Sequence, residues 1–162
     1  MNTYSAAAAL QRFRKSWKAY VLQSTLAGIT SFGILLALNL QDAVIIAALG
    51  ASSFIVFGRP FDLTARSRNV IGGHMTGFLV GSLCAFLPHV CITATLASYA
   101  LSVGLSIFFM VLFYLQHPPA AGTALGVAMR GCTHDTFIAI ATITLGLAAA
   151  HYLLKPYLKN LF

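Results

Sequence analysis

The residues with the greatest chemical potential in this sequence lie in one stretch around His117. His117 is ionisable, and Pro118 and Pro119 follow it directly, between an uncharged apolar run and a shorter one. Proline is tolerated in the first turn of a helix and disfavours helical geometry in the residue before it. The pattern therefore predicts a helix that stops, an extended corner at His117 and a new short helix over residues 118–129. Free N–H groups and the positive dipole end at that helix start would suit a small anion, and Thr123 would add a hydroxyl one turn in. The predicted binding residues of this stretch are His117, Pro118, Pro119, Gly122 and Thr123.

Other candidate binding residues come from three further places. Ser52 and Ser53 lie in an earlier short apolar run and would approach the site from there, although serine in a membrane helix often bonds its own i−4 carbonyl instead. Arg68 and Asn69 follow the most charged loop, where they would either draw anions toward a pore or set the topology. His74 stands one turn into the next apolar run and suits an anion contact or a proton relay.

Several kinds of chemistry find no support in the residue types. No two of the five histidines have metal-ligand spacing, no nucleophile–base pair is evident, and the three acidic residues stand near segment ends. We therefore expect no catalytic residue, no metal and no cofactor. An enzyme acting on a lipid headgroup is a rival class that would need such groups at one interface. The ten Lys and Arg residues form short clusters between apolar runs, so the net charge of +7 does not indicate a nucleic-acid surface.

The composition is that of a membrane protein. Apolar residues make up 59% of the chain and charged residues 8%, against about 25% charged residues in an ordinary soluble domain. We predict a single-domain, all-α, polytopic membrane protein with the lipid bilayer as its main partner. Its six predicted membrane segments cover residues 20–40, 43–58, 70–87, 92–115, 118–129 and 136–154.

The segments follow a three-plus-three pattern. In each half a long run ends in Leu-Gln, a short glycine-containing segment and a charged loop follow, and another run completes the half. Three segments per half give an inverted repeat, and short or broken segments at matching positions point to a transporter's binding site. Chance agreement between apolar segments is the alternative. Six crossings place nine of the ten basic residues on the cytoplasmic side together with the N-terminus, and five crossings with a re-entrant half-helix are the second arrangement.

The ends and the glycines complete the organisation. Residues 1–19 are predicted to form a basic amphipathic helix at the membrane interface, or else a frayed basic tail. Residues 20–155 form the transmembrane domain, and residues 156–162 form a short basic tail. A stripe of Gly73, Gly77 and Gly81 predicts tight helix–helix contact. Together with a second GxxxG pair, Gly122 and Gly126, it leads us to expect a homo-oligomer, with a dimer as first choice.

Three ordered motifs resemble the HPP family of integral membrane proteins, which is named after the tripeptide at residue 117. They are His117-Pro118-Pro119-Ala120 with Gly122-Thr123-Ala124-Leu125, Gly50-Ala51-Ser52-Ser53 leading to Phe57-Gly58-Arg59-Pro60, and Arg68-Asn69-Val70-Ile71-Gly72-Gly73-His74. The sequence departs from the family pattern in two places. Ala121-Gly122 stands where the family more often has Gly-Ala, and Ser67 stands where a proline often precedes Arg-Asn.

The resemblance also implies a function. The family is usually described with four spans, fewer than the six predicted here, and its plant and cyanobacterial members are associated with nitrite transport. The resemblance therefore implies a transporter for a small inorganic anion, nitrite first, in the bacterial cytoplasmic membrane. An anion channel and a non-transporting structural or regulatory membrane protein are the alternatives.

Overall fold

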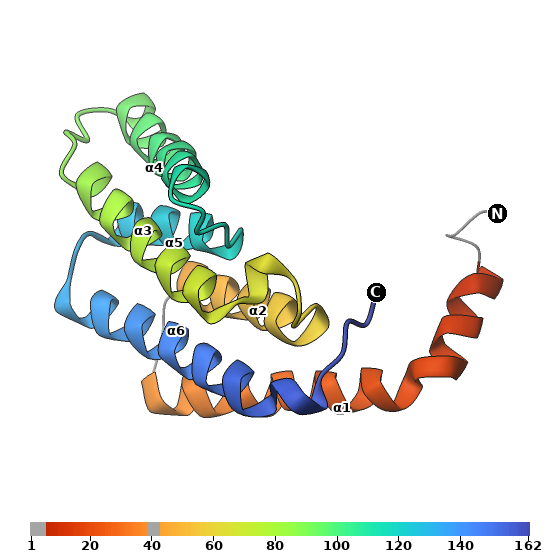
Figure 1. Cartoon of the computed structure of the whole chain (residues 1–162). Coiled ribbons are helices and arrows are strands. Elements are labelled where there is room, and N and C mark those ends of the chain that lie inside the picture. The colour runs from red at the N-terminus through yellow and green to blue at the C-terminus, as the bar shows by residue number, and fades with distance from the viewer. Residues whose placement is uncertain (1–5, 39–42) are drawn as a thin grey trace.

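The chain folds into a bundle of helices (Figure 1). The computed structural model describes residues 6–38 and 43–162, and within them it contains helices and no strand. The α-helices are α1 (Ala6–Leu38), α2 (Ala43–Gly58), α3 (Ser67–Ala85), α4 (Ile92–Leu112), α5 (Pro119–Arg130) and α6 (His134–Leu154), with short 3-10 helices η1 (Leu63–Ala65) and η2 (Lys155–Tyr157). The prediction of an all-α polytopic membrane protein is confirmed, and α2 has the bounds that the sequence predicted.

Among the described residues, three helices are long and apolar enough to cross a membrane, over Arg14–Leu36, Ile92–Leu112 and His134–Tyr157. Large apolar side chains such as Phe32, Leu36 and Phe86 are exposed on the outside of the bundle, as in a protein surrounded by lipid. α2 is apolar but has 16 residues. The 12 residues of α5 cover about 18 Å, well short of a hydrocarbon core of about 30 Å.

α1 differs from the predicted two-part start of the chain. It begins at Ala6 and continues without interruption to Leu38, so the basic lead-in and the first span are one helix. Its N-terminal part turns away from the rest of the bundle (Figure 1). The first five residues of the predicted interfacial helix, and the predicted turn at 39–42, lie outside the described residues.

The helices form two related halves, α1–α3 and α4–α6, which pack by exchanging their last helices. In Figure 1, α1 and α3 run from right to left and α2 from left to right, whereas α4, α5 and α6 run in the opposite sense to their counterparts. α1 packs on α2 and α6, just as α4 packs on α5 and α3; α2 packs on α6 as α5 packs on α3. The remaining main contacts, α2 with α5 and α3 with α6, each join a helix to its own counterpart in the other half. Exchanging the halves therefore reproduces the set of main contacts, which is what an inverted repeat requires.

The predicted glycine stripe packs against α5. Its members are Gly73, Gly77 and Gly81. A Cβ atom on Gly77 would collide with the backbone carbonyl of Ala120, so only glycine permits this approach. On α5, Gly126 faces α2, and a methyl group in place of its hydrogen would lie 3.4 Å from the side chain of Val44. Both GxxxG patterns are thus used inside the chain, and they no longer support the expected dimer.

The break before α5 begins earlier than the prolines alone predict. α4 ends at Leu112, where the sequence predicted a span to residue 115. Tyr114 takes a left-handed φ of 56°, and the amide of Leu115 donates to the carbonyl of Met110 at 2.8 Å while that of Tyr114 donates to Val111 at 3.2 Å. This is a Schellman ending, in which the left-handed position is usually glycine. The corner at His117 therefore follows a capped helix end.

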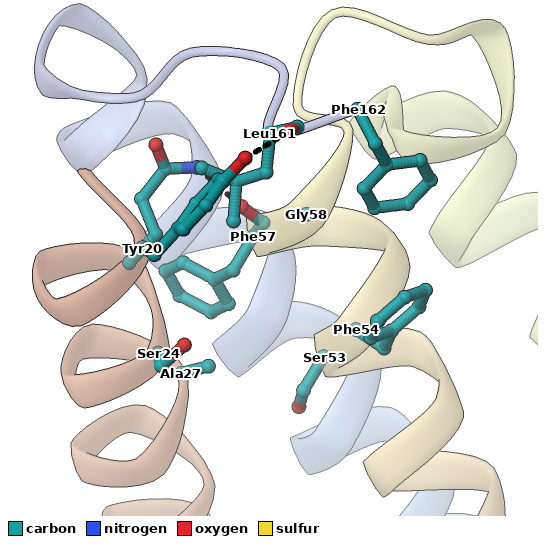
Figure 2. Close-up of a pocket in the computed structure, with 10 residues that line it drawn as sticks. Tyr20, Ser24, Ala27, Ser53, Phe54, Phe57, Gly58, Leu161 and Phe162 are labelled. Carbon is teal, nitrogen blue, oxygen red and sulfur yellow. Dashed lines mark hydrogen bonds between the residues drawn. The ribbon is translucent and has the colours of Figure 1, made fainter. Parts of the chain in front are cut away.

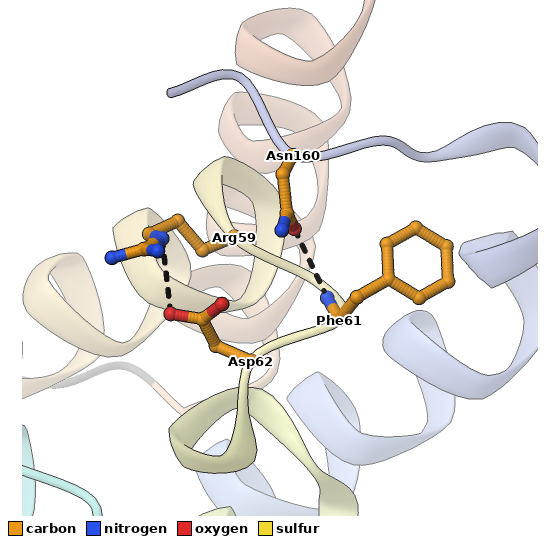
Figure 3. Close-up of polar contacts among 4 residues, drawn as sticks. All are labelled: Arg59, Phe61, Asp62 and Asn160. Carbon is orange, nitrogen blue, oxygen red and sulfur yellow. Dashed lines mark hydrogen bonds and ion pairs between the residues drawn. The ribbon is translucent and has the colours of Figure 1, made fainter.

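The three basic clusters predicted to share one side of the membrane gather at one end of the bundle. Gln23 of α1 donates to the carbonyls of Phe57 and Lys159 and accepts from the Lys159 amide, which ties the C-terminal segment to α1 and α2. In the loop after α2, Arg59 pairs with Asp62 at 2.9 Å, and the amide of Phe61 donates to Asn160 at 3.3 Å (Figure 3). The N-terminal part of α1, this loop and the tail thus form one basic end.

Candidate functional site

Four polar side chains from three helices and the corner before α5 meet in the interior. Ser52 of α2 lies 2.9 Å from Nε2 of His74 in α3 and 2.9 Å from Nε2 of His117 before α5. On the far side of His74, its Nδ1 lies 2.7 Å from the hydroxyl of Thr123 in α5. Nδ1 of His117 lies 2.8 Å from the carbonyl oxygen of Thr64 in η1. The four side chains of Ser52, His74, His117 and Thr123, hereafter the histidine cluster, join both short helices to the glycine-striped helix.

The histidine cluster is sealed from the surface. Ser52 and His117 are 0% exposed, and His74 and Thr123 are 1% exposed. The two imidazole rings lie 5.0 Å apart between centroids and are tilted by 54°. Within the described residues no group of three or more His, Cys, Asp or Glu is arranged to hold a metal ion.

The hydrogen bonds fix where the protons of the neutral cluster lie. A carbonyl oxygen can only accept, so Nδ1 of His117 carries the proton that it donates to Thr64, and its Nε2 is an acceptor. Ser52 has one hydroxyl proton and donates it to that Nε2, so it must accept from Nε2–H of His74. Nδ1 of His74 is then an acceptor for the hydroxyl of Thr123. Every donor of the cluster is thus paired with an acceptor, and the hydrogen bonds all point the same way, from Thr123 through His74 and Ser52 to His117 and the carbonyl of Thr64.

The backbone amides at the start of α5 differ from those that the predicted anion site requires. Pro118 and Pro119 have no N–H, and the next two amides are taken, Ala120 by the carbonyl of His117 at 2.9 Å and Ala121 by that of Pro118 at 3.1 Å. The short i→i−3 bonds arise because the prolines force a tight first turn. The prediction of free N–H groups there was wrong, and the donors available to a ligand are those of the histidine cluster.

The pattern of the family described as HPP, transmembrane region, matches residues 11–157, nearly the whole chain. The chain belongs to the HPP family of membrane proteins. It is also similar to a protein of Dictyostelium discoideum described as a transmembrane protein, with 39% identity over 93 residues. That match covers 55% of this chain and 31% of the relative, so the chain spans less than half the relative's length. No solved structure matches the chain.

The three HPP motifs converge on the histidine cluster. The first supplies His117 and Thr123, the second Ser52, and the third His74. Between motifs the contacts join residues 22, 49 and 65 positions apart in the chain. The sequence predicted all four as site residues, and the fold brings all four together.

The other predicted site residues have different surroundings. Ser53 points away from the cluster and shares a hydrogen bond of 2.9 Å with Ser31 of α1. Pro118 is exposed, whereas Pro119 is buried as the first residue of α5. Gly122 faces α2, and a methyl group placed there would lie 3.9 Å from Ala48. These residues shape and pack the short helices of the HPP protein and do not contact the histidine cluster by hydrogen bonds.

Arg68 and Asn69 support the corner before α5. The exposed guanidinium of Arg68 donates to the carbonyl of Phe113 at 3.3 Å, and the buried amide of Asn69 donates to the carbonyl of Gln116 at 3.2 Å. Both bonds fall on carbonyls of the non-helical segment between α4 and α5, where a helix ending leaves backbone carbonyls to be satisfied from outside the helix. Oδ1 of Asn69 and Oε1 of Gln116 are buried without a hydrogen-bond donor among the described residues. The expected role of Arg68 in drawing anions stays a prediction.

Sequence reasoning missed two features of the site. Thr64 acts through its backbone carbonyl, so its side-chain type carries no signal. The pairing of Ser52 with His117 is a nucleophile–base contact of the kind that no spacing in the sequence indicated, because the two residues are 65 positions apart and only the fold joins them. The hydroxyl also accepts from His74 and is fully buried, so this pair differs from an exposed hydrolase dyad.

A separate cavity of about 340 Å³ lies at the basic end, between α1, α2 and the C-terminal segment (Figure 2). Its lining is mostly apolar, including Phe54, Phe57 and Phe162, with the hydroxyls of Ser24 and Ser53 among them. Figure 2 shows Tyr20 reaching toward Leu161, whose carbonyl accepts its hydroxyl at 3.3 Å. Ser53 lines this cavity while the preceding serine faces the histidine cluster, so the two sites use different faces of α2.

Proposed function

We propose that this HPP protein is a transporter for a small inorganic anion, with nitrite as the first substrate, and that the histidine cluster is its binding site. The observation that carries the proposal is the complete burial of His74 and His117, linked through Ser52, inside a bundle surrounded by lipid. Ionisable side chains inside a membrane are costly, and they mark substrate or proton pathways.

The cluster suits an anion for electrostatic reasons. Moving a bare anion into a low-dielectric interior costs several kcal/mol or more unless positive charge and donors meet it. His74 and His117 can each become an imidazolium, and Ser52 and Thr123 can turn their hydroxyls toward a ligand. A monovalent anion of two or three heavy atoms needs no larger set of donors, and modest affinity allows it to leave.

The closed cluster favours a carrier over an open channel. Its 0–1% exposure means that α2, α3 or α5 must move before an ion reaches His117. α2 and α5 are short helices in exchanged positions of the two halves, the arrangement in which one repeat rocks against the other around a central site. We therefore propose alternating access, with uniport and proton coupling both compatible with this step.

The Ser52–His117 pair is one observation that favours a rival function, that of a hydrolase. A serine hydrolase would need an exposed hydroxyl and donors for an oxyanion, and Ser52 is fully buried with its oxygen shared between two imidazoles. We propose that the chain is not an enzyme. Covalent labelling of Ser52 by a fluorophosphonate probe in the purified protein would contradict this.

The test of transport is nitrite exchange in vesicles. Purified protein in proteoliposomes is loaded with nitrite at mildly alkaline pH, and entry of ¹⁵N-nitrite by counterflow is compared with empty vesicles. His117→Ala is expected to lower the rate about tenfold or more, because losing a hydrogen bond to a charged group costs about 1.5–3 kcal/mol. His134→Ala, an exposed histidine at the start of α6, serves as the control. No flux above empty vesicles for nitrite, nitrate, chloride or formate would leave the non-transporting role.

The setting follows from the basic end. The N-terminal part of α1, the 59–68 loop and the C-terminal tail gather there, as Lys159 bonding to Ser16 at 3.4 Å illustrates. By the positive-inside rule we place this end, and the N-terminus, in the cytoplasm. We propose the bacterial cytoplasmic membrane as the membrane concerned. The dimer has lost the support of the glycine stripes and stays a prediction.

A further inference from the structure

We infer that Thr123, His74, Ser52 and His117 form a proton relay that ends at His117, and that the proton held there is the one that travels with the anion. The inference rests on the proposed function and deepens it. It assigns the coupling ion and the order of the groups that carry it.

The geometry of the relay is a chain of three hydrogen bonds. Thr123 to His74 measures 2.7 Å, His74 to Ser52 2.9 Å and Ser52 to His117 2.9 Å, all within the range of direct proton transfer. The two inner members can each receive one proton and pass on another: His74 through its two ring nitrogens, and Ser52 through its hydroxyl oxygen. The contact beyond His117 is the carbonyl of Thr64, which accepts a hydrogen bond and has no proton to pass on. The hydrogen-bond chain therefore ends at His117 and begins at the hydroxyl of Thr123, which is buried with the rest of the cluster until the helices move.

Each proton along the relay is accounted for. A proton reaching the oxygen of Thr123 lets its hydroxyl proton pass to Nδ1 of His74, whose Nε2 proton passes to Ser52, whose own proton passes to Nε2 of His117. Each O–H or N–H bond that breaks is matched by one that forms on the next atom. The result is a neutral His74 in its other tautomer and an imidazolium at His117, which still donates to Thr64. Release reverses the same steps.

The elements around His117 offer that imidazolium no carboxylate. α2 contains no titratable residue, and α5 contains only Arg130, at its far end. α3 carries Arg68, engaged with Phe113, and Cys84 near its other end.

Further titratable groups lie in the loop between α2 and α3, in the segment before α5, which carries the exposed Tyr114, and in α4 and α6. In the loop, Asp62 is paired with Arg59, and Arg66 is exposed. α4 carries Tyr99, and α6, which packs on α3 and α2, carries its titratable groups at its ends: His134, Asp135, His151 and Tyr152. Within the described residues a proton on His117 thus lacks a protein counter-ion, so an anion from outside supplies the balancing charge.

The assignment of tautomers can be tested without any transport. In protein labelled with ¹⁵N-histidine and held in lipid nanodiscs, the imidazole nitrogen shifts should give the Nδ1–H form for His117 and the Nε2–H form for His74. Single His→Gln variants identify each signal. The same tautomer at both rings, or the reverse assignment, would overturn the relay even if nitrite transport were established.

The coupling is tested with matched serine variants in vesicles that contain a fluorescent pH dye. In the wild type, inward nitrite movement driven by a pH gradient should be accompanied by proton entry in fixed proportion. Ser52→Ala should lower this net uptake about tenfold or more, and by a larger factor than it lowers nitrite-for-nitrite exchange, which needs no net proton movement. Ser52→Thr should restore the proportion. Ser53→Ala, which removes a buried hydroxyl bonded to α1, should behave as the wild type.

The outcomes separate the relay from the transport function. Absence of exchange by the wild type sinks the proposed function. Exchange without proton entry, or a Ser52→Ala protein in which both processes fall equally, sinks the relay and leaves transport standing. If Ser52→Ala fails to fold, the tautomer measurement on the wild type decides the question.

Discussion

α2 and α5 occupy equivalent places in the two halves of the chain, and they contribute differently to the site. Each is too short to cross a bilayer comfortably, and each packs on the last helix of the other half and on the opposite short helix. α5 meets α3 backbone to backbone along the glycine stripe, whereas α6 has the single glycine Gly146, which faces the side chain of Ile34 in α1. α5 and its leading corner bring His117 and Thr123 to the site, while α2 brings the hydroxyl of Ser52.

The helix packing is therefore symmetric, whereas the residues of the site are distributed unequally between equivalent helices. The same helix contacts recur in both halves, yet the close approach and both histidines belong to the α3–α5 pair. We infer that α3 and α5 form the rigid part of the site and that α2 closes against it. Three sets of substitutions test this contrast, in order of decreasing effect.

The largest effect is expected from Gly77→Ala. A Cβ atom at this position meets the backbone carbonyl of Ala120, which cannot move aside without shifting α5, so we expect a loss of about 2 kcal/mol or more. At Gly146 the methyl meets the tip of Ile34 at 3.1 Å, which can turn away, so Gly146→Ala should cost less than about 1 kcal/mol.

Unfolding in detergent, followed by tryptophan fluorescence and circular dichroism, measures both variants. Gly104→Ala is the control, because a Cβ there meets nothing within 4 Å. Equal losses at Gly77 and Gly146 would show that α3 and α6 are packed equally tightly, which would contradict the difference between the two equivalent helices.

An intermediate effect is expected at the corner before α5. Asn69→Leu removes the buried side-chain donor of the Gln116 carbonyl, which costs about 1–3 kcal/mol. Arg68→Leu removes an exposed bond to Phe113, and we expect a change below about 1 kcal/mol. The same unfolding assay compares them. A larger effect from Arg68→Leu would mean that the exposed bond of Arg68 stabilises the corner more than the buried bond of Asn69 does.

The smallest effect is a stabilisation by Tyr114→Gly. A left-handed φ costs a non-glycine residue about 1–2 kcal/mol, and glycine returns roughly half of that through its more flexible unfolded chain, so a net gain of about 0.5 kcal/mol is expected. Tyr157→Gly is the matched control, since Tyr157 is 72% exposed against 71% for Tyr114 and its φ is negative. Destabilisation by both variants alike would show that Tyr114 is held by contacts of its ring and not strained by its backbone.

Local sequence determined much of this protein. Uncharged runs of about twenty residues identify helices such as α4 and α6, because a long apolar stretch has few other ways to bury its backbone in lipid. The prolines after His117 determined a break, because a ring in place of an N–H cannot continue the preceding helix. The motifs also pointed to Ser52, His74 and Thr123, and the basic clusters predicted a common end.

Only the tertiary structure decided which of these residues act together. The glycine stripe could serve an outside partner or α5, and the choice depends on how α3 lies in the bundle. Ser52 and Ser53 are adjacent in sequence, and the rotation of α2 alone sends one to the histidines and the other to α1. The free amides expected at the start of α5 were lost to its first turn, which depends on local backbone geometry that residue types leave open. The direction of every proton in the cluster follows from one carbonyl, that of Thr64, and a backbone atom leaves no mark in a sequence.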